Sequence, residues 1–285
     1  MDKSLVIGIQ GGEASFHDTA AHLYFGENIK VVPCDTFRKL CQVVHSGEVD
    51  FAMMAIENSI AGSIIPNYSL IKEFNHHIIG EIKLRIMMNL MALPGQKVEE
   101  INKVMSHYMA LLQCSDFLSQ YPQMEEEKTH DTADSAKIIR QNNLEGVAAI
   151  AGKRAAKVYG LEILASEIET IKQNFTRFLV LKKGDKAHTV DYKNKAMLSF
   201  ELPHKVGSLA NILKKVVDYK INLTKIQSIP LIGKPDEYTF YIDCEFASEG
   251  NYRQCLDEIG KDILNLTILG EFQKGEFVYD RSGSK

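Results

Sequence analysis

Three polar side chains that could bind or orient a small ligand follow a buried-looking strand in the first third of the chain. Glu57, Asn58 and Ser59 come directly after the apolar run 51–56, which its pattern predicts to be a strand. In open α/β sheets ligands bind at the carboxyl ends of the strands, where a carboxylate, an amide and a hydroxyl can orient a polar ligand. The alternative is structural, because Asn and Ser also cap helices.

A second candidate, Thr176-Arg177, lies just before the apolar run 178–181. The guanidinium of Arg177 can form two parallel hydrogen bonds with a carboxylate. The hydroxyl of Thr176 can donate to a leaving oxygen in a general-acid role. An arginine on the surface beside an ordinary strand residue is the alternative explanation.

Two further segments complete the set of candidates. The Gly-rich turn 8–16 precedes a predicted helix whose free N–H groups favour an anion, and Ser15 either adds a hydroxyl or caps that helix. The turn matches neither the dinucleotide fingerprint nor the Walker pattern.

Ser106 ends a short predicted strand, and Gln113 follows near the start of a helix. The histidines have no carboxylate or cysteine at ligand spacing, so we expect no metal site.

The elements that must position these residues alternate between strands and helices over the first 180 residues. Strands are predicted at 4–9, 29–32, 51–56, 103–105, 147–151 and 178–181, and helices at 14–25, 36–46, 110–121, 134–141 and 153–159. This alternation predicts an α/β domain with a mostly parallel sheet. The last third has the order βαββαβ, which predicts a small open sandwich with helices on one face.

A charged segment that is poor in large aliphatic residues separates the two parts. It predicts a first domain at 1–181, a linker at 182–195, a second domain at 196–275 and a tail at 276–285.

Composition narrows the class of protein. The 285 residues are 45% hydrophobic and 25% charged, with a net charge of −4 and no long basic block. These values are typical of a globular protein and argue against nucleic acid or a membrane as the main partner. Five cysteines without a C-x-x-C, and a start without the features of a signal peptide, lead us to expect a cytoplasmic protein.

The order of these motifs resembles prephenate dehydratases that carry a C-terminal ACT regulatory domain. The motifs are the turn 11–16, the segment 56–59 with Gly62, Ser106-His107 with 110–114, Thr132-Ala133, 148–151, 159–161, 176–181, 207–209 and 221–226. The resemblance implies a catalytic domain of two α/β lobes, similar to periplasmic binding proteins, with the active site in the cleft between them. It implies a ferredoxin-like ACT domain after it, and conversion of prephenate to phenylpyruvate in phenylalanine biosynthesis by a lyase that needs no cofactor.

The resemblance also implies roles for individual residues. Thr176 would donate to the leaving hydroxyl, Arg177 would hold or help to organise the substrate carboxylates, and Glu57 would give catalytic support or positioning. The residues implied to bind substrate are Ser15, Asn58, Ser59, Ser106 and Gln113.

A regulatory site is implied in the ACT domain. Phenylalanine would bind at Gly207, Ser208 and Leu209 from one subunit, with Asn222 and Leu223 across a subunit interface. ACT domains pair edge to edge, so the resemblance implies a dimer or a tetramer.

Two alternatives remain open from the sequence. One is an arogenate dehydratase, whose substrate carries an amino group in place of the pyruvyl keto group. The other is a non-catalytic protein that binds an amino acid or a keto acid in the same cleft. Thr176 beside Arg177 favours an enzyme, because a binding protein has no need of a donor aimed at a leaving group.

Overall fold

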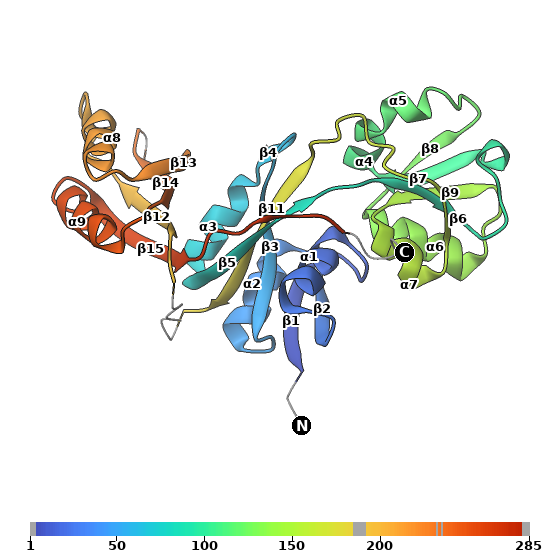
Figure 1. The fold of residues 1–285 in the computed structure, drawn as a ribbon, viewed down its shortest axis with the longest axis horizontal. Helices are drawn as coiled ribbons and strands as arrows, with labels where there is room; N and C mark the ends of the chain where they lie inside the picture. Colours follow the sequence, from blue (N-terminus) through green and yellow to red (C-terminus); the bar gives the residue numbers. More distant parts are fainter. Residues whose placement is uncertain (1–3, 185–191, 232, 235, 281–285) are drawn as a thin grey trace. The chain divides into compact units, whose positions relative to one another are not determined.

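The computed structural model describes residues 4–184, 192–231, 233–234 and 236–280, and the chain divides into two compact units (Figure 1). The first unit takes in the described residues of 1–64, 82–178 and 277–285, and the second those of 65–81 and 179–276. Strands β5 (His76–Arg85) and β11 (Phe175–Lys183) contribute residues to both units. None of the described helices is both long and apolar enough to cross a membrane.

The first lobe of the first unit is built on the strand order β11-β3-β1-β2. Strand β1 (Leu5–Gln10) pairs in parallel with β2 (Ile29–Cys34) and with β3 (Phe51–Asn58), and the short β4 (Gly62–Ser63) pairs with the end of β3. Helix α1 (Phe16–Phe25) follows β1, and α2 (Phe37–Ser46) follows β2. The parallel strands place the carboxyl ends of β1 and β3 at the same edge of the sheet, which is where ligands bind in open α/β sheets.

The second lobe of the same unit has its own sheet, with the order β10-β6-β9-β7-β8. Strand β7 (Lys103–His107) is parallel to β8 (Glu125–Thr129) and β9 (Val147–Ala151), whereas β6 (Asn89–Ala92) is antiparallel to β9 and to β10 (Glu162–Ala165). The helical elements are η1 (Val98–Glu100), α4 (Tyr108–Gln113), α5 (Ser115–Leu118), α6 (Thr132–Asn142) and α7 (Lys153–Tyr159). The prediction of a two-lobed α/β fold is confirmed, although the predicted helix 110–121 is two short helices that meet at Cys114.

The second unit contains the predicted βαββαβ order, namely β12 (Lys195–Glu201), α8 (Ser208–Asp218), β13 (Asn222–Pro230), β14 (Tyr238–Glu245), α9 (Glu249–Ile259) and β15 (Leu264–Phe272). Its strands lie in the order β13-β14-β12-β15-β5, so β13 is an edge strand. Both helices pack on one face of the sheet, because Ile212, Val216, Tyr252 and Leu256 share a buried core with Leu198, Phe200 and Ile242.

The compact units differ from the sequence division in three segments, and the first is 179–181, which was predicted for the first domain but belongs to the second unit. Helix α3 (Ile65–Glu73) and the first half of β5 belong with the C-terminal strands, because Ile78 pairs with Gly270 and the ring of Tyr68 packs 5.3 Å from that of Tyr241. Strand β16 (Phe277–Val278), in the predicted tail, belongs to the first unit and pairs with residues 83–84 of β5. Residues 185–191 of the predicted linker and 281–285 of the predicted tail lie outside the described residues.

Candidate active site

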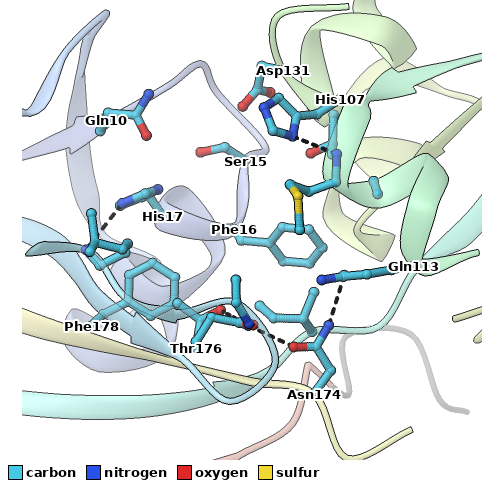
Figure 2. Close-up of a pocket in the computed structure, with 18 of the residues that line it drawn as sticks. Gln10, Ser15, Phe16, His17, His107, Gln113, Asp131, Asn174, Thr176 and Phe178 are labelled. Carbon is cyan, nitrogen blue, oxygen red and sulfur yellow. Dashed lines mark hydrogen bonds between the residues drawn. The ribbon is translucent and has the colours of Figure 1, made fainter. Parts of the chain in front are cut away.

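A pocket of about 310 Å³ in the first unit is lined by residues of both lobes (Figure 2). Its volume suits a small metabolite. The first lobe contributes Gln10, Ser15, Phe16, His17, Asn58, Thr176 and Phe178, among others. The second lobe contributes His107, Met109, Ala110, Gln113, His130, Asp131 and Thr132. Four of the predicted site residues therefore line one pocket: Ser15, Asn58, Gln113 and Thr176.

The side-chain amide of Asn58 orients Thr176 by donating a hydrogen bond to its hydroxyl oxygen. The side-chain oxygen of Asn58 accepts the backbone N–H groups of Ile60 and Ala61, each at 2.9 Å, so its NH₂ group must face the other way. That NH₂ group donates to Oγ1 of Thr176 at 3.0 Å. The hydroxyl proton of Thr176 finds no acceptor in the part of the chain that the structure describes, so it is available to a group in the pocket.

Asn174, which the sequence did not single out, links Asn58 to Gln113. It is fully buried, its Oδ1 accepts from the Asn58 NH₂ group at 2.7 Å, and its own NH₂ group donates to Oε1 of Gln113 at 3.0 Å. Figure 2 shows the hydrogen bond between Asn174 and Gln113, with Thr176 beside Asn174. Asn174 lies two residues before Thr176, and strand periodicity places residues at this spacing on one face, which was a signal for it.

Arg177 and Glu57 do not line the pocket. Arg177 is 4% exposed, and its Nη1 lies 3.4 Å from Oε1 of Glu57. Because neighbouring strand residues point to opposite faces, Arg177 lies on the other face of β11 from Thr176 and Phe178. Arg177 and Glu57 form an ion pair next to the strand that carries Thr176, and the expectation that Arg177 holds substrate carboxylates stays a prediction.

Ser59 and Ser106 also lie outside the pocket lining, and the hydroxyls of both form hydrogen bonds with backbone groups. The hydroxyl of Ser59 accepts the backbone N–H of Phe175 at 2.9 Å and donates to the carbonyl of Gln173 at 3.2 Å, which fixes the segment just before Thr176. Ser106 is fully buried and donates to the carbonyl of Ile150 at 2.6 Å, which ties β7 to β9. The contact of Ser59 and Ser106 with substrate stays a prediction.

The turn into α1 places Ser15 at the pocket wall. Ser15 is the N-cap of α1 and accepts the N–H of Asp18, while a carboxylate oxygen of Asp18 accepts the N–H of Ala14 at 2.7 Å. The same carboxylate oxygen accepts from Arg154 of α7 at 2.8 Å, so a buried ion pair joins the two lobes beside the pocket. Ala14 holds a left-handed φ of 66°, a conformation that costs a residue with a Cβ about 1–2 kcal/mol.

His17 was not predicted, and it lines the pocket as a neutral imidazole. Its Nε2 accepts the backbone N–H of Ala55 at 3.3 Å, and its ring packs edge-on against Phe178 at 4.9 Å. Burial lowers the pKa of His17 to about 3. Because Nε2 is an acceptor, the proton of the neutral ring sits on Nδ1.

The pKa of His17 makes stability sensitive to acid. The unfolded chain binds a proton near pH 6.5 and the folded chain only near 3, so stability is complete above pH 6.5 and is lost as pH falls toward 3. The loss is at most about 1.4 kcal/mol per pH unit. In His17→Gln, whose amide oxygen can still accept the Ala55 N–H, urea unfolding at pH 6.5 and 4.5 should show a smaller acid loss than in the wild type. An equal loss in both proteins would contradict the assignment.

The predicted effector residues lie at opposite ends of α8 in one chain. Gly207, the N-cap of α8, has a left-handed φ of 84°, and no side chain caps the helix. Asn222 and Leu223 begin β13, after the far end of this 11-residue helix, which is about 16 Å long. A single chain therefore does not bring the two groups together.

A family model described as prephenate dehydratase matches residues 7–186. The chloroplastic "Arogenate dehydratase/prephenate dehydratase 2" of Arabidopsis thaliana is 34% identical over 276 residues, an alignment that covers 93% of this chain and 72% of the relative.

Two solved structures share the fold over nearly the whole chain. A prephenate dehydratase from Arthrobacter aurescens in complex with L-Phe has a TM-score of 0.84 at 24% identity and is matched over 94% of this chain and 90% of its own. GqqA, described as a novel type of quorum-quenching acylase, has a TM-score of 0.86 at 26% identity over 94% of this chain and 98% of its own.

Proposed function

The chain belongs to the prephenate dehydratase family, a family of lyases, and from this premise we propose that it removes carbon dioxide and water from prephenate or from the related amino acid arogenate. The product is phenylpyruvate from prephenate and phenylalanine from arogenate. The observation that carries the proposal is the hydroxyl of Thr176, which the Asn58 amide holds with its proton free for a group in the pocket.

The chemistry asks little of the protein beyond positioning. The bond between the ring and its carboxylate breaks, the electron pair enters the ring, and the bond between the ring and its hydroxyl breaks. The departing hydroxide takes up a proton and leaves as water, and aromatisation drives the reaction. A donor aimed at the departing oxygen stabilises the charge that develops there, and such general-acid assistance contributes about 10²–10⁴ in rate.

The direct test is a product assay on the purified full-length protein. Prephenate is supplied and phenylpyruvate is followed by its absorbance, and arogenate is supplied in parallel and phenylalanine is quantified by chromatography. Conversion of at least one substrate is expected. If neither is converted, the proposed function is wrong and the non-catalytic binding protein becomes the better explanation.

We further propose that phenylalanine inhibits the enzyme at a site shared by two chains. The solved relative that contains L-Phe supports an amino-acid effector. Because Gly207–Leu209 and Asn222–Leu223 lie at opposite ends of α8, one site needs both segments from different subunits. The edge strand β13 offers unpaired backbone groups for such pairing.

Phenylalanine should therefore bind and lower turnover. Allosteric coupling of the usual size, about 1–3 kcal/mol, corresponds to a 5- to 150-fold change in affinity, and substrate should weaken phenylalanine binding by the same factor. Calorimetric titration with and without substrate, with turnover measured in parallel, checks this. Absence of both heat and inhibition would rule out the effector site, and heat without inhibition would rule out the coupling.

A further inference from the structure

The charges around the pocket favour one of the two substrate classes. Among its described lining residues there is one carboxylate, Asp131, and there is no lysine or arginine. Arg177, which follows Thr176 in the chain, is not among the lining residues and pairs with Glu57. The pocket therefore offers a substrate one fixed negative charge and no fixed positive side chain.

Asp131 is held so that one of its oxygens remains available. It is the N-cap of the 11-residue helix α6, and its Oδ1 accepts the N–H groups of Ala133 at 2.7 Å and Asp134 at 3.3 Å. Its Oδ2 has no donor in the part of the chain that the structure describes. It faces Gly11 of the other lobe, where an added Cβ would lie 3.2 Å from it. Burial raises the pKa of Asp131, so a cationic partner would stabilise its charged form.

The position of Asp131 relative to Thr176 matches the shape of the substrates. Figure 2 shows Asp131, beside His107, across the pocket from Thr176. In both substrates the leaving hydroxyl and the three-carbon side chain are on opposite ring carbons. A substrate whose hydroxyl lies at Thr176 consequently directs its side chain toward the wall that carries Asp131.

The two substrates differ at that side chain. Arogenate carries an ammonium group there, and prephenate carries a keto oxygen. An ammonium group donates strong, charge-assisted hydrogen bonds to a carboxylate, whereas a keto oxygen presents lone pairs to it. We propose that Oδ2 of Asp131 binds the ammonium group and makes the amino-acid substrate, arogenate, the preferred one. This inference rests on the proposed dehydratase function.

The experiment compares kcat/KM for arogenate and for prephenate in the wild type and in Asp131→Asn. Asn is as good an N-cap as Asp and retains the oxygen that accepts the two N–H groups, so the fold should be preserved. The wild type should prefer arogenate, and the variant should lose about 10- to 100-fold of the arogenate-to-prephenate ratio, since hydrogen bonds to charged groups are of this size. Asp131→Ser, which also caps helices, is the second variant in case Asn destabilises the helix.

Asp134→Asn is the matched control. It removes a negative charge from the same helix turn, but Asp134 does not line the pocket, so the substrate ratio should stay as in the wild type. A wild type that prefers prephenate, or a ratio that is unchanged in Asp131→Asn and Asp131→Ser, overturns the role of Asp131 while the dehydratase function stands. Absence of activity on both substrates in the wild type overturns the function and this inference together.

Discussion

Replacement of Thr176 by alanine should lower kcat by about 10²-fold or more and leave the thermal midpoint almost unchanged. The hydroxyl of Thr176 accepts a hydrogen bond from Asn58 and donates to no group in the described chain. Its removal therefore costs the fold one hydrogen bond at the pocket wall. The same removal takes away the donor that we assign to the departing hydroxide. Loss of a donor that acts only in the transition state lowers kcat without a matching rise in KM. Steady-state kinetics with the preferred substrate measures both.

Thr176→Ser is the matched control for this prediction. Serine retains the hydroxyl and can still accept from the Asn58 amide, so it should recover most of the lost turnover. Asn58→Ala should have an intermediate effect, because it leaves the hydroxyl in place but frees it to rotate. Near wild-type kcat in Thr176→Ala would end the role assigned to this residue.

Parts of this site could be predicted because they follow local rules. Asn58 and Ser15 lie just after strands of a parallel sheet, where side chains from separate strands converge. The same rules favour Asn174 over Arg177 as a lining residue of this pocket, because adjacent residues of a strand point to opposite faces and Asn174 lies two residues before Thr176.

Other features depend on contacts that local sequence does not show. His17 reads as an ordinary helix residue, and it becomes a pocket residue because β3 and β11 bring Ala55 and Phe178 against it. Strand β8 was missed for a different reason. Its residues, Glu125 to Thr129, are exposed and charged without apolar alternation, and the strand forms at the sheet edge by pairing with β7. Charged residues on an edge strand are a common protection against aggregation.

Lys195 is the clearest case of a residue whose role the sequence concealed. It closes a charged segment and was assigned to the linker 182–195, but in the structure it begins β12 and is 2% exposed. Its ammonium group lies 3.0 Å from Oε1 of Glu81, a residue 114 positions earlier that is also buried. The same oxygen accepts the N–H of Gly275 at 3.1 Å. A buried lysine is tolerated when a carboxylate pairs with it, and that partner is invisible at this sequence separation.

Lys195→Met should therefore destabilise the protein by about 3–5 kcal/mol, because it leaves the carboxylate of Glu81 buried without its ammonium partner. Glu245 also loses a cationic neighbour in this variant, because its Oε1 lies 3.7 Å from the same ammonium group, and this loss adds to the destabilisation. The free energy of unfolding from urea titrations measures the effect.

The double variant Lys195→Met/Glu81→Gln should regain most of the loss, because a neutral amide can still accept the N–H of Gly275 and needs no counter-charge. Lys261→Met, which removes an exposed ion pair with Glu258 in the same unit, should hardly move the unfolding midpoint. If the double variant were as unstable as Lys195→Met, the loss would come from packing around the lysine stem rather than from the broken ion pair with Glu81.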